Sequence, residues 1–245
     1  MFGTLIGIFI TSTAIVIGAD SAISENNGNV FNLLKPGKTC RTGSGSVATL
    51  QGEYLIELIP ETHDAWLVNS FRKTCISLEN MNASLEEQAN LISGELLAQV
   101  QSRMSTIDKA YLTKRFGKQS HVNYMSVSGY ENGEPRVIVQ ELRLDQSADG
   151  NWKPSVVAAP DLSPKRCEPR FHGEDWTAKR LLKDLPDGCP ASTVDQAIKL
   201  FEDAVRLTMK DGRRPGMRGG FVGGELDLWV IPLDGIAKHK RLPEP

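Results

Sequence analysis

The sequence carries little net charge and no long apolar run, which excludes two broad classes of protein. Its formal net charge is −2 over 245 residues, so we expect no nucleic-acid partner and no attraction to anionic membranes. No continuous apolar stretch reaches the roughly 20 residues that a membrane-spanning helix needs. With 40% hydrophobic residues the chain can bury a sizeable core. The composition therefore predicts an ordinary globular protein, which we expect to be cytoplasmic.

Signatures of several enzyme classes are missing as well. The chain contains no P-loop, no G-x-G-x-x-G after a strand and no G-x-S-x-G nucleophile elbow. The histidines are scattered and form no metal-ligand spacing: His63, His121, His172 and His239. We therefore expect neither a cofactor nor a metal.

Cysteine is scarce, and the spacing of the cysteines matches no metal-binding or redox motif. The four cysteines lie far apart and include no C-x-x-C pair: Cys40, Cys75, Cys167 and Cys189. No histidine stands near them at zinc spacing. The expectation is that they are reduced thiols with a structural role.

The first 20 residues contain two short apolar runs separated by a polar break. Residues 5–10 and 14–19 are apolar and rich in β-branched side chains, and residues 11–13 read Thr-Ser-Thr. This pattern predicts a buried antiparallel hairpin. Because the start of one strand then lies beside the end of the other, we expect Thr4 and Asp20 to be neighbours.

A secretory signal peptide is the competing interpretation of the same stretch. Residues 19–22 offer small side chains of the kind found at cleavage sites. However, no Lys or Arg precedes Lys35, so a positively charged leader segment is missing, and the polar break interrupts the apolar run. We favour the hairpin.

Four residues of this region, with their neighbours, resemble a known family. Gly3-Thr4, Gly18-Ala19-Asp20-Ser21, Lys38 and Gly52 are similar to motifs of the proteasome β-subunit branch of the N-terminal nucleophile hydrolases. Gly223-Gly224 and the strand after them resemble a later motif of that family. The resemblance implies an α+β fold, the four-layer αββα sandwich, and a single domain over residues 1–245.

The resemblance also implies a mechanism. Thr4 would become the nucleophile after self-cleavage between Gly3 and Thr4, with its freed α-amino group as the base. Asp20 would hold Lys38, whose charge would ease deprotonation of the hydroxyl, and the Gly52 N–H would stabilise the oxyanion. The implied substrate is a peptide or another amide, and the implied state is a homo-oligomer.

The middle and end of the chain predict helices and strands from pattern alone. We expect helices over about 63–80, behind the capping box Ser84-Leu85-Glu86-Glu87, and over about 192–211. Asn132-Gly133 predicts a hairpin between two strands, and another strand is expected at 226–231. Residues 146–172 read as a long irregular connection.

A second function of another class stays open. Residues 210–220 form a Gly-rich loop with four cations, which could hold phosphate or RNA on a catalytically inactive scaffold. By ungapped counting, Gly219 and Val222 stand where the family carries a supporting Asp and Ser. Asp211 could substitute after a rearrangement of the loop, without a spacing argument for it.

Overall fold

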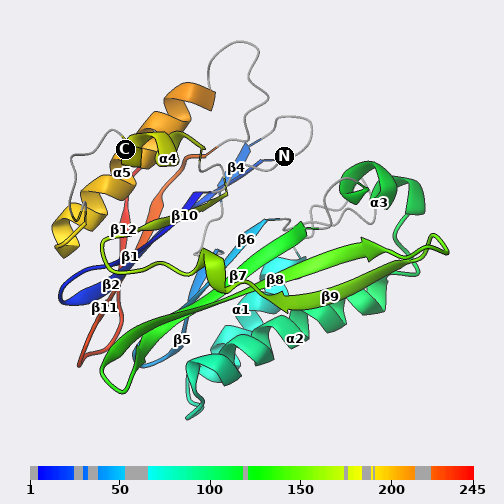
Figure 1. Ribbon diagram of the computed structural model, residues 1–245, viewed down its shortest axis with the longest axis horizontal. Coiled ribbons are helices and arrows are strands. Elements are labelled where there is room, and N and C mark those ends of the chain that lie inside the picture. The colour runs from blue at the N-terminus through cyan, green and yellow to red at the C-terminus, as the bar shows by residue number, and fades with distance from the viewer. Residues whose placement is uncertain are drawn as a thin grey trace.

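The computed structural model of the protein describes residues 5–24, 30–32, 38–52, 66–117, 121–173, 176–183, 189, 191–212 and 222–245. Figure 1 shows two large sheets, each with helices on one of its faces. All pairings between neighbouring strands of these sheets are antiparallel.

The first sheet has five strands and contains the first and the last strand of the described chain. Its order is β10-β1-β2-β11-β12, with the bounds β1 (Leu5–Ile10), β2 (Ala14–Asp20), β10 (Arg170–Gly173), β11 (Leu226–Pro232) and β12 (Lys238–Leu242). The predicted hairpin is confirmed as β1 and β2, in which Ile6 pairs with Ala19. Both strands are buried along their whole length, so the stretch that could be read as a signal peptide is core.

The second sheet also has five strands, in the order β5-β6-β7-β8-β9. Their bounds are β5 (Thr39–Gly43), β6 (Ser46–Gly52), β7 (His121–Glu131), β8 (Glu134–Gln146) and β9 (Trp152–Ala158). The Asn132-Gly133 hairpin is confirmed between β7 and β8, where both residues have a positive φ. A separate pair joins β3 (Ala22–Ser24) and β4 (Val30–Asn32).

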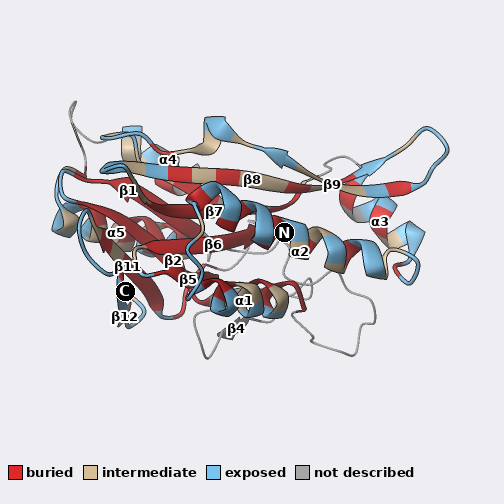
Figure 2. Ribbon diagram, turned by 90° about the horizontal axis from the view of Figure 1, so that it is seen from below, coloured by how far each residue is buried: buried red, intermediate tan, exposed pale blue. Residues whose placement is uncertain are grey.

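The two large sheets share an apolar core. Alternation along a strand sends successive side chains to opposite faces, and Ile6, Ile8, Ile15 and Ile17 all belong to the cluster that also holds Val47, Val137 and Val139 of the second sheet. Figure 2 shows β1, β2 and β6 as mostly buried, whereas β8 combines buried, intermediate and exposed residues. The opposite face of β1 and β2 carries Leu5, Phe9 and Val16, which pack on helices. Residues buried on both faces explain why these strands read as continuous apolar runs.

In the part of the chain that the structure describes, five α-helices lie outside the sheets. They are α1 (Trp66–Leu78), α2 (Leu85–Arg103), α3 (Lys109–Phe116), α4 (Trp176–Lys183) and α5 (Val194–Gly212), with a short 3-10 helix, η1, at Pro160–Leu162. The apolar faces of α1 and α2 pack on the second sheet, and those of α4 and α5 pack on the first. The helices predicted over about 63–80, behind Ser84 and over about 192–211 are thereby confirmed.

The predicted four-layer αββα sandwich is wrong for this chain. Its described part is dominated by two antiparallel five-stranded sheets with few helices, and the helical cover of the first sheet is one 19-residue helix, α5, with the eight-residue α4. Residues 146–172, predicted as an irregular connection, contain β9 and the start of β10. Each of these strands forms an edge of one sheet, so the chain has more strand and less irregular structure than predicted.

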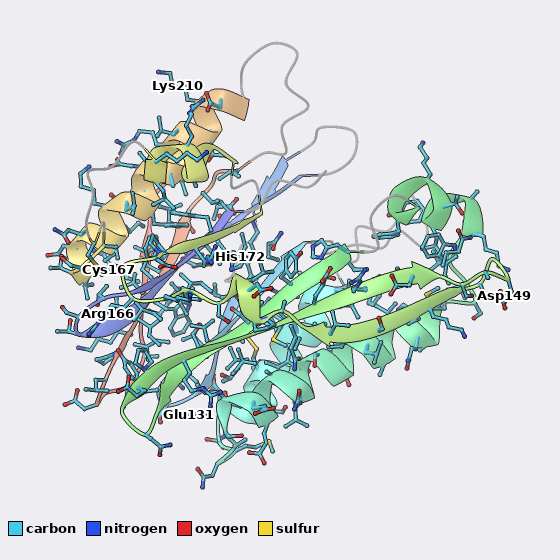
Figure 3. All side chains as sticks on the ribbon, in the orientation of Figure 1. Glu131, Asp149, Arg166, Cys167, His172 and Lys210 are labelled. Carbon is cyan, nitrogen blue, oxygen red and sulfur yellow. A yellow bond between two sulfur atoms is a disulfide. The ribbon has the colours of Figure 1, made fainter. Side chains whose placement is uncertain are left out.

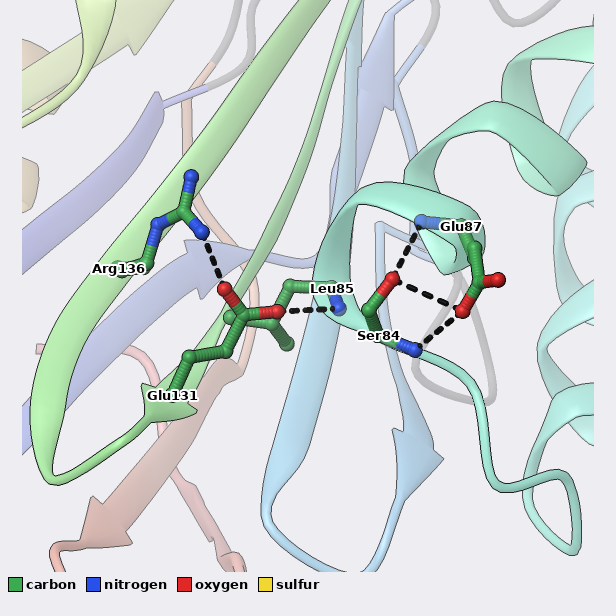
Figure 4. A network of polar contacts seen from close by, with 5 residues as sticks. All are labelled: Ser84, Leu85, Glu87, Glu131 and Arg136. Atoms are coloured by element: carbon green, nitrogen blue, oxygen red, sulfur yellow. Dashed lines mark hydrogen bonds and ion pairs between the residues drawn. The ribbon is translucent and has the colours of Figure 1, made fainter.

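The N-terminus of α2 is tied to the β7–β8 hairpin. Ser84 and Glu87 form the predicted capping box, in which each side chain accepts from the other residue's backbone N–H. The Glu131 carboxylate accepts from the Leu85 N–H at 2.9 Å and pairs with Arg136 (Figure 4). Carboxylates at this end also complement the positive end of the helix dipole.

The expectation of four reduced thiols is wrong. Cys40 in β5 and Cys75 in α1 form one disulfide, with Cα atoms 6.2 Å apart, and Cys167 and Cys189 form another, with Cα atoms 4.4 Å apart. The second joins the stretch before β10 to the stretch before α5. Disulfides are typical of oxidising compartments, which is at odds with the expected cytoplasmic location. That location stays a prediction. None of the described helices is both long and apolar enough to cross a membrane.

One side chain of α5 fills a notch in the first sheet. Gly7 and Gly18 are cross-strand partners on β1 and β2. A Cβ added to Gly18 would lie 2.4 Å from the Phe201 ring, and one added to Gly7 would lie 2.8 Å from it. Phe201 is fully buried, so the ring cannot move out of the way without disturbing its packed neighbours.

We expect Gly18→Ala to lower the free energy of unfolding by about 1–3 kcal/mol, the usual effect of overpacking. Gly94→Ala on α2 is the matched control, because a Cβ there meets nothing within 4 Å. In a helix interior that change should add about 0.5–1 kcal/mol. Urea unfolding monitored by circular dichroism measures both changes. An unfolding midpoint unchanged in Gly18→Ala would contradict the close contact between position 18 and the Phe201 ring.

Candidate active site

The candidate site lies where β1 begins and β2 ends. Thr4, the predicted nucleophile, is outside the described residues, and Leu5 is the first residue that the structure describes. The Leu5 N–H donates to Asp20 Oδ1 at 2.7 Å. This hydrogen bond attaches the start of β1 to the carboxylate of Asp20. The proximity of Thr4 itself to Asp20 stays a prediction.

Asp20 and Lys38 form a buried ion pair. Lys38 Nζ donates to Asp20 Oδ1 at 2.8 Å, and the two side chains are 1% and 0% exposed. Lys38 directly precedes β5 of the second sheet, whereas Asp20 ends β2 of the first. The pair thus connects the two sheets at the candidate site.

Burial acts on both members of this pair. It raises the pKa of Asp20, and the charge and hydrogen bond of Lys38 together with the N–H groups of Leu5 and Gly223 oppose that rise. It lowers the pKa of Lys38, against the attraction of Asp20 and, more weakly, of Asp227. An isolated charge would be costly in this place, so each ion depends on its partner.

Asp20 has a third donor from the far end of the sequence. The Gly223 N–H donates to Asp20 Oδ2 at 3.2 Å, and Leu226 pairs with Asp20 across β11 and β2. Both carboxylate oxygens are therefore occupied. Gly223, one of the two glycines of the late motif, therefore contacts Asp20. The sequence did not predict this contact.

Gly52, the predicted oxyanion donor, ends β6 opposite Asn123 of β7. Its φ is +124°, and an added Cβ would lie 2.3 Å from the Val122 carbonyl oxygen, so no other residue fits this conformation. Two residues earlier, the Leu50 N–H donates to the Lys38 carbonyl at 2.8 Å. Gly52 and Lys38 therefore lie on paired neighbouring segments, and the oxyanion role stays a prediction.

A second charged group adjoins the ion pair. Asp227 on β11 is 1% exposed and accepts from His239 Nε2 at 3.2 Å and from Arg241 Nε at 3.1 Å. Its charge also favours the protonated form of Lys38. The sequence analysis missed this group because β12, which carries His239 and Arg241, was not predicted.

The other residues considered from the sequence lie elsewhere. Asp211, at the end of α5, is 3% exposed and accepts from Arg180 Nη2 at 2.9 Å. Its carboxylate thus has a partner on α4. Of the basic loop 210–220, residues 213–220 are outside the described residues, and exposed Lys210 projects from the end of α5 (Figure 3). Among the described residues, no three His, Cys, Asp or Glu side chains gather as a metal site.

Comparison with solved structures reveals a shared fold. The chain resembles Anbu (ancestral beta-subunit) from Yersinia bercovieri at 16% identity, with a TM-score of 0.58, over 98% of this chain and 87% of that one. It also resembles the chain in the helical assembly of the Anbu complex from Pseudomonas aeruginosa, at 12% identity with a TM-score of 0.60 over 98% and 86%. The chain has the fold of these Anbu proteins.

These findings correct the family inferred from the sequence motifs. The assignment to the proteasome β-subunit branch of the N-terminal nucleophile hydrolases is wrong, because the two similar structures named above are Anbu proteins, a distinct proteasome-like group. No family model matches the chain. No curated protein matches it either. At such low identity the likeness establishes the fold alone.

Removing one member of the Asp20–Lys38 pair should be strongly destabilising. We expect Asp20→Asn and Lys38→Met each to lower the free energy of unfolding by about 3–5 kcal/mol, because each leaves a buried charge unpaired. The double variant should lose much less than the sum.

The exposed pair Lys199–Asp203 on α5 gives the control for this cycle. Lys199→Met should change the stability by less than about 1 kcal/mol. Denaturant unfolding of all four variants measures the coupling. Additive losses at Asp20 and Lys38 would show that the two charges do not stabilise each other.

Proposed function

We propose that the chain is a threonine-type amide hydrolase, a peptidase in the simplest form, that acts through Thr4. The observation that carries the proposal is the buried Asp20–Lys38 pair, which is joined to the backbone of Leu5, the residue after Thr4. A buried cation beside a hydroxyl favours its deprotonated form.

Activity requires that the Thr4 nitrogen become a free amine. In the sequence it is part of the Gly3–Thr4 amide, which cannot accept a proton as a base. The Thr4 hydroxyl attacks the Gly3 carbonyl carbon, and the acyl group moves from nitrogen to oxygen as an ester. Water then hydrolyses the ester, releasing residues 1–3 with a new carboxylate and leaving Thr4 with its amine and hydroxyl.

The same groups then act on a substrate amide. The freed amine, with an ordinary pKa of about 8, accepts the hydroxyl proton as the oxygen attacks the carbonyl. Lys38 stabilises the alkoxide, Asp20 fixes the position of Lys38, and the Gly52 N–H stabilises the oxyanion. The proton goes to the departing amine, and water releases the acyl group from Thr4.

Self-assembly is the second part of the proposal. One structure of the same fold is described as a helical assembly of the Anbu complex. A nucleophile that cuts amides with little selectivity is hazardous when it is freely accessible, and an assembly restricts access to it. We therefore expect several copies of this chain to associate.

Intact mass tests the processing step. The purified protein should lose the mass of Met1, Phe2 and Gly3 during incubation, and Thr4→Ala should retain all three residues. Thr4→Ser is the informative companion, because it keeps a hydroxyl at the attacking position. Retention of residues 1–3 in the parent after prolonged incubation would reject the hydrolase and favour an inactive binding scaffold.

Turnover tests the role of Lys38. In a fluorogenic peptide assay, Lys38→Ala should lower kcat by about 10²–10³, the usual effect of removing one group that stabilises negative charge developing on an oxygen. Arg213→Ala with Arg214→Ala is the control and should leave kcat within about twofold. A scaffold that binds anions through residues 210–220 would show the reverse, with ligand retention lost in the arginine variant and unchanged in Lys38→Ala.

A further inference from the structure

Two neighbouring N–H groups in the turn before β11 bind two different carboxylates. The Gly223 N–H donates to Asp20 at 3.2 Å, and the Gly224 N–H donates to Glu244 Oε2 at 3.0 Å. We propose that Glu244 is a positioning residue: by holding Gly224, it keeps the Gly223 N–H against Asp20. Its effect on catalysis rests on the proposed function, whereas its effect on the geometry of Asp20 does not.

The Gly223 N–H controls the orientation of the Asp20 carboxylate. Lys38 Nζ and the Leu5 N–H both donate to Oδ1, and Gly223 is the donor to Oδ2 among the described residues. Without it, the carboxylate can rotate about its Cβ–Cγ bond, and Oδ1 then shifts relative to Lys38. Asp20 is 0% exposed, so bulk water does not readily replace the lost donor.

The turn depends on contacts from outside itself. Gly224 has a φ of +74°, a conformation that glycine adopts without strain. Neither glycine has a side chain that could pack and fix the backbone. The Glu244 carboxylate lies close to both, because a Cβ added at Gly223 would be 3.8 Å from Oε2. The Met209 side chain is nearer still, 3.5 Å from that added Cβ, but it is apolar. Glu244 thus gives Gly224 a polar contact beside the one that Asp20 gives Gly223.

The fold delivers Glu244 to this place. Leu242 at the end of β12 pairs with Leu226 at the start of β11. Arg241 links the same ends through Glu225 at 2.9 Å and Asp227 at 3.1 Å. Only Pro243 separates Leu242 from Glu244, and its ring fixes its own φ angle. The stretch after β12 is therefore anchored immediately before the carboxylate that binds Gly224.

Three variants of the full chain test this role. Glu244→Ala removes the acceptor, Glu244→Gln keeps a carbonyl oxygen at the same reach, and Glu134→Ala removes an exposed glutamate from the distant β7–β8 hairpin. Hydrogen exchange measured by mass spectrometry reports on residues 222–228. Acylation of lysines by an amine-reactive reagent reports on Lys38, with exposed Lys238 as the internal reference.

In Glu244→Ala we expect exchange at 222–228 to rise about tenfold and Lys38, which is 1% exposed in the parent, to become acylated. On a peptide substrate, kcat should fall about tenfold with KM changed by less than about twofold. Glu244→Gln should restore all three readouts to near the parent values, and Glu134→Ala should match the parent.

Parent-like exchange and labelling in Glu244→Ala would overturn the proposal. Equal impairment of Glu244→Ala and Glu244→Gln would overturn it too, because the effect would then come from the charge and not from the accepted hydrogen bond. If the parent hydrolyses no peptide while exchange and labelling change as expected, the positioning role stands and the proposed hydrolase function fails.

Discussion

The buried ion pair between Asp20 and Lys38 is the interaction on which the rest of this structure depends. Removing two opposite charges from water is expensive, and their attraction compensates only when other hydrogen bonds satisfy what remains. Here the carboxylate receives three donors from three separate parts of the chain, namely Lys38, Leu5 and Gly223. The pair therefore requires β2, the start of β5 and the turn before β11 to be in place together.

The core around the pair supports the same arrangement. Strands β1 and β2 are buried on both faces, by the second sheet on one side and by α4 and α5 on the other. Next to Lys38, Thr39 accepts from the indole N–H of Trp229 at 3.0 Å, so a polar contact between the two sheets flanks the ion pair. Apolar burial holds the sheets together, while these polar contacts fix their relative position at the candidate site.

Local patterns in the sequence predicted many of the helices, strands and turns. Contacts between residues far apart in the sequence were not predicted. The apolar hairpin, the Ser84 capping box and the Asn132-Gly133 turn depend on neighbouring residues and were confirmed. The edge strand β10 is only four residues long and carries no alternation by which to recognise it. The disulfides depend on Cα atoms brought together by the fold, and the Gly223 donor comes from 203 positions beyond Asp20. The catalytic roles of Thr4, Asp20, Lys38 and Gly52 stay predictions.

The notch at Gly7 and Gly18 also fixes where α5 lies along its own axis. The Phe201 ring occupies the space above both glycines, so a shift of α5 by one turn, about 5.4 Å, would move the ring onto residues that have a Cβ and would empty the notch. The helix therefore has one axial register on the sheet. Its last turn, with Asp211 bound to Arg180, then marks a fixed starting point for the chain segment that leads to the glycine pair beside Asp20.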